Sequence, residues 1–491
     1  DLALYYAAAG RVDEAEAYLA RVEKQILKRH GAQSPRAREF YGQLASHFLL
    51  RGDAVRADRY REKVWVLARK APKNDPGVLM ELLQLIDSRV TRRRLGEARE
   101  LITELEARIK VVGEVAPGIR LRLVLVKVGL LDEEGNRAEA TRLLLAAEEL
   151  AAAIDDRSAR FLYHRTAAEH AQSAGEYPTA GRHFARAGEV GSVSEAVTSG
   201  MFESAAMMYW AAGRVDEAIA NADRAGEVMD ALLPTLLISG TDAEKRKQLL
   251  FATLQSDALL SLGADGFPKN AAAAALALRT LVRRKAVVLD AVTRSGEVVR
   301  AQGTADGQAR LAVQAELREA LAAVVYHPAP RTYYDEAELQ KLTADIDAAE
   351  RGLALAAQGA TAEKPVTLDE LRARLPDGGA LVEFTAYRPT DPRKAGKDQA
   401  AARRYVAFVL PKSGPVAAIP LGDVAEIDGR IATLRKALQT PRGNFEAPAR
   451  GLHDVLVAAL GPHLGGAKHL VIAPGGALSL VPFAALVDGD G

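Results

Sequence analysis

The chain has 491 residues, of which 48% are hydrophobic and 26% are charged, and its formal net charge is +1. That length is more than one hydrophobic core usually organises, so we expect two or three domains. A net charge near zero excludes a bulk attraction to nucleic acid or anionic membrane, and the absence of cysteine excludes disulfides, thiolate metal sites and a cysteine nucleophile within these residues.

A short sequence word recurs along the first half of the chain, with a glycine followed five residues later by an alanine. Counted from alanine to alanine, the six copies are 42, 41, 42, 40 and 38 residues apart. Such even spacing is typical of a repeat architecture. The copies pair Gly10 with Ala15, Gly52 with Ala57, Arg93 with Ala98, Gly135 with Ala140, Gly175 with Ala180 and Gly213 with Ala218.

Each copy of the word predicts a helical hairpin. An apolar-periodic helix precedes the glycine, as in residues 40–50, and a second helix follows it, as in residues 54–69. Glycine suits the left-handed cap that ends the first helix, and the alanine lets the two helices approach closely. Because one hairpin cannot bury its own apolar face, we expect the hairpins to stack into a right-handed superhelix.

Residues 1–233 therefore resemble an array of tetratricopeptide repeats, with a period longer than that family's usual ~34 residues. Another type of α-solenoid stays open. Such an array presents a concave surface, which favours a protein or peptide ligand in the groove, with plain scaffolding or self-association as the alternative. Tyrosines of the first helices line the groove or pack between helices, and we assign binding to none of them: Tyr5, Tyr41, Tyr163 and Tyr209.

Residues 234–362 lack the repeat word but keep helical periodicity, so they predict a helical connector of a few long helices. Helix-breaking residues lie at 263–268, 303–307 and 327–330. A basic cluster, Arg283-Arg284-Lys285, lies in the first long helix. Since no aromatic residues and no basic stripe accompany it, we expect a solvated helix face and not a nucleic-acid contact.

Strand signals begin after the connector, so residues 363–491 predict an α/β sheet layered by helices. Strands that alternate with helices occur in several α/β folds, and periodicity alone does not separate them. The expected elements, in order, are a helix at 368–374, a strand at 380–385, a polar loop at 388–402, a hairpin of strands 405–410 and 416–421, helices at 424–438 and 451–460, and a strand at 470–473 that is buried on both faces.

The ordered set of motifs in this region resembles the CHAT family of caspase-like cysteine peptidase domains. A Leu-Pro-Asp turn precedes Leu-Val-Glu-Phe, a Tyr-Val-Ala-Phe-Val-Leu strand follows, and the chain then reads Ile-x-Pro-x-Gly-x-Leu-x-x-x-Pro-Phe from Ile472 to Phe483. The helix at residues 278–290 also is similar to one that commonly precedes CHAT domains. Family members usually carry aspartate where this chain has Gly475, so we expect a looser turn there.

The resemblance implies a cysteine nucleophile with a histidine base, supplied by later strands of the sheet. Neither residue is matched in this chain. We therefore expect a fragment that is open at both ends, stops before the catalytic half and is catalytically inactive by itself, with no catalytic residue, no cofactor and no bound metal. The histidines near the end have spacings that fit no zinc pattern, and the acidic pair that follows is typical of a loop: His453, His463 and His469, then Asp488 and Asp490.

We expect the intact parent to be a bacterial, cytoplasmic and regulated cysteine endopeptidase, in which the repeats bind a trigger and the α/β domain cleaves a protein substrate. The alternative is a non-catalytic repeat adaptor with a pseudo-peptidase domain. We expect no nucleic-acid partner, because residues 366–491 carry 15 basic and 13 acidic side chains. We also expect no membrane partner, since no apolar run approaches the roughly 18 residues of a membrane span.

Overall fold

The computed structural model describes residues 12–50, 54–72, 75, 77–191, 194–238, 256–325, 336–356, 366–394, 402–440 and 444–488. The chain divides into two compact units, residues 1–201 and residues 202–491. The boundaries predicted from sequence at residues 233 and 362 stay predictions. Among the helices of the described ranges, none is both long enough and apolar enough to cross a bilayer.

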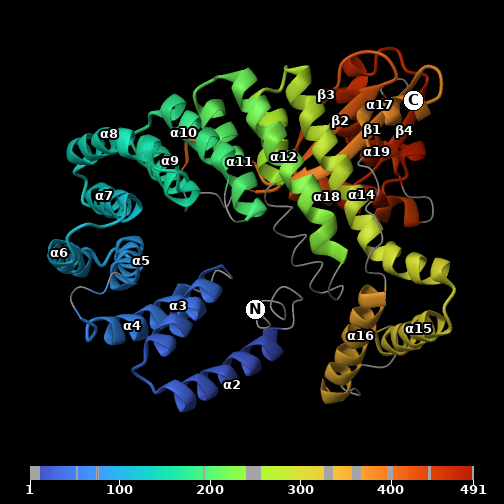
Figure 1. Ribbon diagram of the computed structural model, residues 1–491. Coiled ribbons are helices and arrows are strands. Elements are labelled where there is room, and N and C mark those ends of the chain that lie inside the picture. The colour runs from blue at the N-terminus through green and yellow to red at the C-terminus, as the bar shows by residue number, and fades with distance from the viewer. Residues whose placement is uncertain are drawn as a thin grey trace. The chain divides into compact units, whose positions relative to one another are not determined.

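The first unit is built of helices that pair through short turns, and the last pair continues into the second unit (Figure 1). Successive pairs stack because the first helices of neighbouring pairs pack on one another, α5 on α7 and α7 on α9. Across both units, the described helices of this array are α2 (Val12–His30), α3 (Pro35–Leu50), α4 (Ala54–Ala68), α5 (Gly77–Thr91), α6 (Leu95–Val112), α7 (Pro117–Glu133), α8 (Arg137–Ala153), α9 (Arg157–Ser173), α10 (Tyr177–Val190), α11 (Glu195–Ala211) and α12 (Val215–Ile238).

The turns of these hairpins confirm the predicted left-handed cap. Gly135, Gly175 and Gly213 have φ of 80°, 76° and 72°, and Arg93, in the glycine position, has φ of 57°. In each case the next residue donates its N–H to the carbonyl five residues earlier at 2.8 Å, which is the hydrogen bond of a Schellman cap. The first two copies, at Gly10 and Gly52, lie outside the described residues.

The alanine of the repeat word is the tightest point of each hairpin. Its side chain is completely buried in every copy whose exposure the structure gives, at Ala57, Ala98, Ala140, Ala180 and Ala218. A larger side chain there would separate the paired helices. The hairpins of the array are therefore specified by one conformational requirement, at the turn, and one steric requirement, five residues later.

The second unit contains a four-stranded sheet in the order β3-β2-β1-β4. β1 (Gly379–Tyr387) pairs antiparallel with β2 (Arg404–Pro411) and parallel with β4 (His469–Ala473), and β2 pairs antiparallel with β3 (Ala417–Asp423). The strand and the hairpin predicted from sequence are thus confirmed. The α-helices described in this unit after α12 are α14 (Ala271–Gln302), α15 (Ala305–Val325), α16 (Glu336–Ala356), α17 (Leu368–Arg374), α18 (Val424–Gln439) and α19 (Glu446–Leu456).

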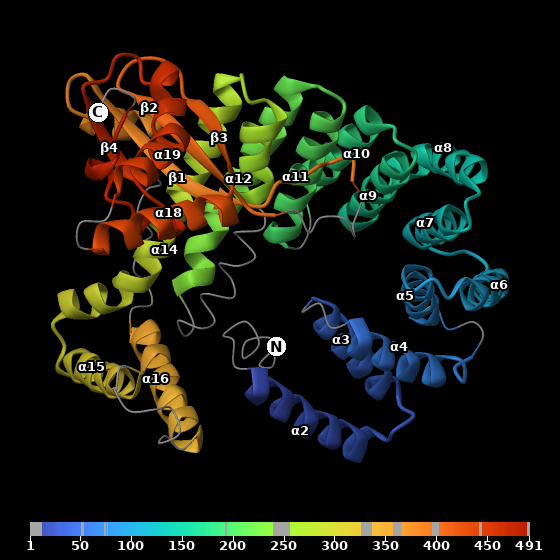
Figure 2. The ribbon, with the colours of Figure 1, turned by 180° about the vertical axis from the view of Figure 1, so that it is seen from behind.

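Different helices cover the two faces of the sheet, as Figures 1 and 2 show from opposite sides. On one face, Val382 and Phe384 of β1 pack with buried residues of α18 and α19. On the other face, Leu381 and Tyr387 pack with the first half of α14. The predicted long helices of the connector are confirmed, but α14 is also one layer of the α/β structure. The predicted break at residues 327–330 lies outside the described residues.

The prediction that the strand at residues 470–473 is buried on both faces is wrong. β4 is an edge strand of the described sheet, with β1 as its neighbour, and Leu470 and Val471 are 38% and 44% exposed. An apolar run predicts burial only if helices or strands cover it. The helices on the two faces of the sheet cover β1 and β2 more completely than β4. Most residues of β1 and β2 are buried, whereas no residue of β4 is.

Candidate functional site

The junction between the last hairpin and the sheet is held by ion pairs on α14. Arg283 and Arg284 place Nη1 at 2.7 Å and 3.0 Å from the two carboxylate oxygens of Asp230 on α12. The Arg284 side chain is only 9% exposed, and burial lowers the pKa of its guanidinium, which Asp230 opposes. The expectation of a solvated helix face is therefore wrong: Arg283 and Arg284 of the basic cluster face α12, where the carboxylate of Asp230 balances their charges.

The third residue of the basic cluster connects α14 to the centre of the sheet. Lys285 forms an ion pair with Glu383, a residue of β1 whose strand neighbours are Phe408 and Ala473. Glu383 is 5% exposed, and burial raises the pKa of its carboxyl against the opposing effect of Lys285. One turn of α14 thus contacts both the last repeat helix and the central strand.

The segment after β4 is fastened to the sheet by Tyr405. Its hydroxyl donates to Asp428 of α18 at 2.9 Å and lies 3.3 Å from the N–H of Ala477. Three separate elements therefore meet at one side chain. Phe483 stacks on Phe384 of β1, with ring centroids 5.8 Å apart, and brings the end of the segment onto the same face of the sheet.

Gly475 lies against β1, and the structure gives a steric reason for glycine there. A Cβ at residue 475 would be 2.6 Å from the carbonyl oxygen of Phe384. Its φ of −123° is accessible to any residue, so conformation is not the reason. The sequence predicts a looser turn at Gly475, but in the structure the backbone of Gly475 is in close contact with β1.

The tyrosines considered as groove residues are buried between helices in the structure. Tyr41, Tyr163 and Tyr209 are 7%, 4% and 8% exposed, and Tyr41 stacks on Tyr60 at 6.0 Å. Their main role is packing within and between hairpins. Tyr5 lies outside the described residues.

The histidines near the end of the chain do not converge. His453 lies on α19, His463 ends a 3-10 turn, and His469 begins β4. Across the described ranges, no three histidine or acidic side chains form a cluster suited to a metal ion. Asp488 is described, and Asp490 lies outside the described residues.

The sequence from α19 to the end of the chain is similar to a known domain family. Residues 446–491 match the family model of the CHAT domain. The match covers α19, β4 and the segment fastened by Tyr405, so the resemblance inferred from the motifs is confirmed for this part of the chain. A CHAT domain is a caspase-like, peptidase-related domain. No curated protein matches the chain.

Proposed function

We propose that the helical hairpins bind a protein segment and that the CHAT-type domain responds to this binding. The observation that carries the proposal is the double contact of α14, through Asp230 to the last repeat helix and through Glu383 to the central strand. Because the side chains of Asp230 and Glu383 are only 11% and 7% exposed, a displacement of α12 changes the surroundings of charges on α14 that are next to the sheet. Within the second unit, the last repeat helix, α12, and the sheet are therefore connected through charged contacts of α14.

The parent protein, in this proposal, is a regulated cysteine endopeptidase that acts on a protein substrate. The CHAT match supports a peptidase-related domain. The 491 residues hold no cysteine, so the thiolate nucleophile and its histidine base are proposed to be supplied by residues outside them. The same lack of cysteine supports the second candidate, a repeat adaptor whose peptidase-like domain is not catalytic.

A cleavage assay separates the two candidates. The gene product extended beyond Gly491 and the 491-residue chain are each incubated with a mixed protein substrate, with and without a thiol-alkylating reagent. We expect alkylation-sensitive cleavage by the extended protein and no cleavage by the 491-residue chain. An extended protein that is inactive with every substrate and lacks a cysteine would contradict the peptidase proposal and leave the adaptor. Cleavage by the shorter chain would contradict both the adaptor and the proposed location of the nucleophile outside the 491 residues.

A further inference from the structure

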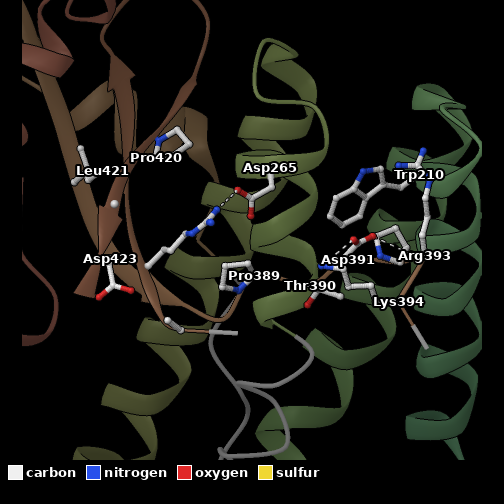
Figure 3. Close-up of a pocket in the computed structure, with 14 residues that line it drawn as sticks. Trp210, Asp265, Pro389, Thr390, Asp391, Arg393, Lys394, Pro420, Leu421 and Asp423 are labelled. Atoms are coloured by element: carbon white, nitrogen blue, oxygen red, sulfur yellow. Dashed lines mark hydrogen bonds and ion pairs between the residues drawn. The ribbon is translucent and has the colours of Figure 1, made fainter. Parts of the chain in front are cut away.

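A cavity of about 850 Å³ lies beside Trp210 of the last hairpin, within the unit of residues 202–491 (Figure 3). Its walls come from α11, from the turn that contains Asp265, from the loop after β1, and from the ends of β2 and β3. The lining has equal numbers of acids and cations: Asp265, Asp391, Asp423, Arg393, Lys394 and Arg404. Its balanced charge favours neither an acidic nor a basic ligand.

A buried histidine in the first unit has a more specific chemistry, because it joins three successive helices through hydrogen bonds. His170 of α9 places Nδ1 2.7 Å from a carboxylate oxygen of Asp132 on α7. Its Nε2 lies 2.9 Å from the hydroxyl oxygen of Thr141 on α8. His170 is 8% exposed, whereas Thr141 is on the surface. These three side chains, the Asp–His–Thr cluster, therefore connect a buried imidazole to an exposed hydroxyl.

The carboxylate of Asp132 determines which ring nitrogen of His170 carries the proton. An ionised carboxylate only accepts hydrogen bonds, so Nδ1 of His170 donates to Asp132. In the neutral imidazole, Nε2 then keeps its lone pair, which faces the Thr141 hydroxyl. The same hydroxyl lies 3.0 Å from the carbonyl oxygen of Arg137, one turn earlier in α8, so it has two acceptors within reach. The imidazole is thus oriented as a base for Thr141.

The neighbouring repeats pack without such a cluster. Positions are compared by counting from the turn residue and from the alanine of each repeat word. One repeat earlier, the residues at the positions of Asp132, Thr141 and His170 are Val90, Arg99 and Leu130. One repeat later, they are Gln172, Gly181 and Met208. The residues in the histidine position, Leu130 and Met208, are buried like His170. The cluster is therefore an addition to the repeat fold and not a requirement of its packing.

A cation lies on the same face of α8 as Thr141. Arg137 comes four residues earlier in the helix, and side chains at this spacing are neighbours on the helix surface. Arg137 is exposed, and within the described ranges it forms no ion pair. Its guanidinium is therefore available to stabilise negative charge that develops on a carbonyl oxygen next to Thr141.

We propose that the Asp–His–Thr cluster is an acyl-transfer site that hydrolyses small activated esters, with Thr141 as the nucleophile. A nucleophile within hydrogen-bond reach of a base, with the base oriented by a third group, is the arrangement that supports acyl transfer on unrelated folds. Because Thr141 is exposed, an ester reaches it from solvent. The activity concerns small esters and not peptide bonds, so it is independent of the CHAT-type domain and of the cleavage assay above.

The reaction has two balanced steps. Nε2 of His170 takes the hydroxyl proton of Thr141 as Oγ1 bonds to the ester carbonyl carbon. The bond from that carbon to the alcohol oxygen then breaks, and His170 returns the proton to the alcohol as it leaves. In the second step, water gives a proton to the same nitrogen and attacks the acyl group. The carboxylic acid departs, and Thr141 recovers its hydroxyl proton from His170.

The 491-residue chain is tested with p-nitrophenyl acetate and with a fluorophosphonate probe. We expect release of p-nitrophenol above the rate in buffer, unaffected by a thiol-alkylating reagent. We also expect the probe to form a phosphonate ester on the tryptic peptide of residues 138–142, in which Thr141 is the only hydroxyl side chain. Mass spectrometry of that peptide distinguishes Thr141 from surface imidazoles that also cleave the ester.

Substitutions assign the roles within the cluster. We expect Thr141→Val to abolish the label and His170→Gln to lower kcat about 100-fold, since it removes the base. Asp132 is a positioning residue, so Asp132→Asn should lower kcat about tenfold or more and leave KM unchanged. Thr103→Val is the matched control, because Thr103 of α6 is another exposed helical threonine 3.0 Å from the carbonyl oxygen four residues earlier.

Circular dichroism establishes that each variant folds, and the exposed Thr141 keeps the test independent of any loss of folding at His170. Three outcomes would overturn the proposal. The first is ester hydrolysis by Thr141→Val at the parent rate, and the second is a label outside residues 138–142 with none inside them. The third is an unchanged kcat in a folded His170→Gln variant, which would make the cluster a purely structural link between the three helices.

Discussion

Asp230 balances two arginines of α14, and one of them, Arg284, is almost fully buried. Removal of one partner from a buried ion pair leaves a charge without compensation in a medium that solvates it poorly. Asp223 forms the neighbouring α12–α14 pair with Arg279, but that pair is 39% and 30% exposed. The two aspartates lie two helical turns apart and differ mainly in burial.

We predict that Asp230→Ala destabilises the second unit by about 3–5 kcal/mol. Asp223→Ala is the control, with an expected cost of about 0–1 kcal/mol, because water replaces an exposed partner. The measurement is urea unfolding followed by Trp210 fluorescence in the Trp65→Phe background. Equal shifts for the two variants would show that burial at Asp230 does not govern the stability of the junction.

Arg93 occupies a backbone conformation that its side chain makes costly. It has the only positive φ of a non-glycine residue among the described parts of the chain, at the position where other copies have glycine. Its side chain gains an ion pair with Glu133 at 2.7 Å, but the Arg93 side chain is 79% exposed. An exposed pair of this kind offsets only part of a left-handed conformation.

We predict that Arg93→Gly is more stable than Arg93→Ala by about 1 kcal/mol, since both lose the ion pair and only glycine relieves the backbone. Urea unfolding of the first unit, followed by Trp65 fluorescence in a Trp210→Phe background, measures the difference. If the alanine variant equalled or exceeded the glycine variant, the strained cap at Arg93 would be refuted.

Two imidazoles, His164 of α9 and His183 of α10, face each other with Nδ1 atoms 3.2 Å apart. Burial, followed by the charges of His183 and Arg186, lowers the pKa of His164 from 6.5 to about 4, with Glu189 opposing and Arg160 adding to the effect. A histidine with a lowered folded-state pKa takes up a proton more readily when unfolded. Its contribution to stability is therefore present above pH 6.5 and is lost as the pH falls toward 4.

We predict that the melting temperature of the first unit falls between pH 6.5 and pH 4 and that His164→Gln makes the fall smaller. Thermal unfolding across this range, followed by Trp65 fluorescence, measures it. His30→Gln, which replaces an exposed histidine at the end of α2, should leave the pH dependence as it is. A His164→Gln profile parallel to that of the parent chain would rule out this origin.

At the scale of elements, the two edges of the sheet differ. β3 carries Pro420, which lacks an N–H, and Pro420 contributes to the cavity wall. β4 has no proline, and its consecutive residues Leu470 and Val471, which point to opposite faces of the sheet, are both exposed. An edge strand with apolar side chains and free backbone groups favours pairing with another strand.

We predict that Val471→Lys reduces concentration-dependent self-association of the 491-residue chain. A charge on an edge strand opposes edge-to-edge pairing. Leu480→Lys is the control, because Leu480 is 51% exposed but lies in a 3-10 turn beyond β4. Sedimentation at increasing protein concentration measures the association. Equal reduction by both variants would indicate general hydrophobic contact in place of strand pairing.

At the scale of the whole molecule, the hydrophobic clusters that the structure describes around α3 to α9 and around the sheet lie in different compact units. The clusters around α3 to α9 contain no residue beyond 201, and the clusters of the sheet contain none before 202. Since cooperativity depends on shared packing, separate clusters favour separate unfolding.

We predict that the chain unfolds in two transitions. Trp65 packs against a cluster of the first unit, and Trp210 lies on α11 in the second, so each reports one transition when the other tryptophan is phenylalanine. Asp230→Ala should move only the midpoint reported by Trp210. One coincident transition from both reporters, moved as a whole by Asp230→Ala, would show that the units unfold together.

Local requirements made much of this protein predictable from its sequence. A left-handed turn favours glycine and a close helix crossing favours alanine, so the repeat word identified the hairpins. Short apolar runs bounded by turn residues identified the strands. The motifs from Ile472 to Phe483 indicated the CHAT resemblance for the same reason, because they lie in one continuous segment.

Tertiary structure decided what depends on partners distant in sequence. Arg284 is buried because Asp230, 54 residues earlier, meets it, and β4 is exposed because no described element covers its edge. The cavity beside Trp210 likewise combines a helix, a turn, a loop and two strand ends. Periodicity describes which face of an element is apolar, but the neighbour that covers that face, and the charge that meets a buried charge, are set only when the chain is folded.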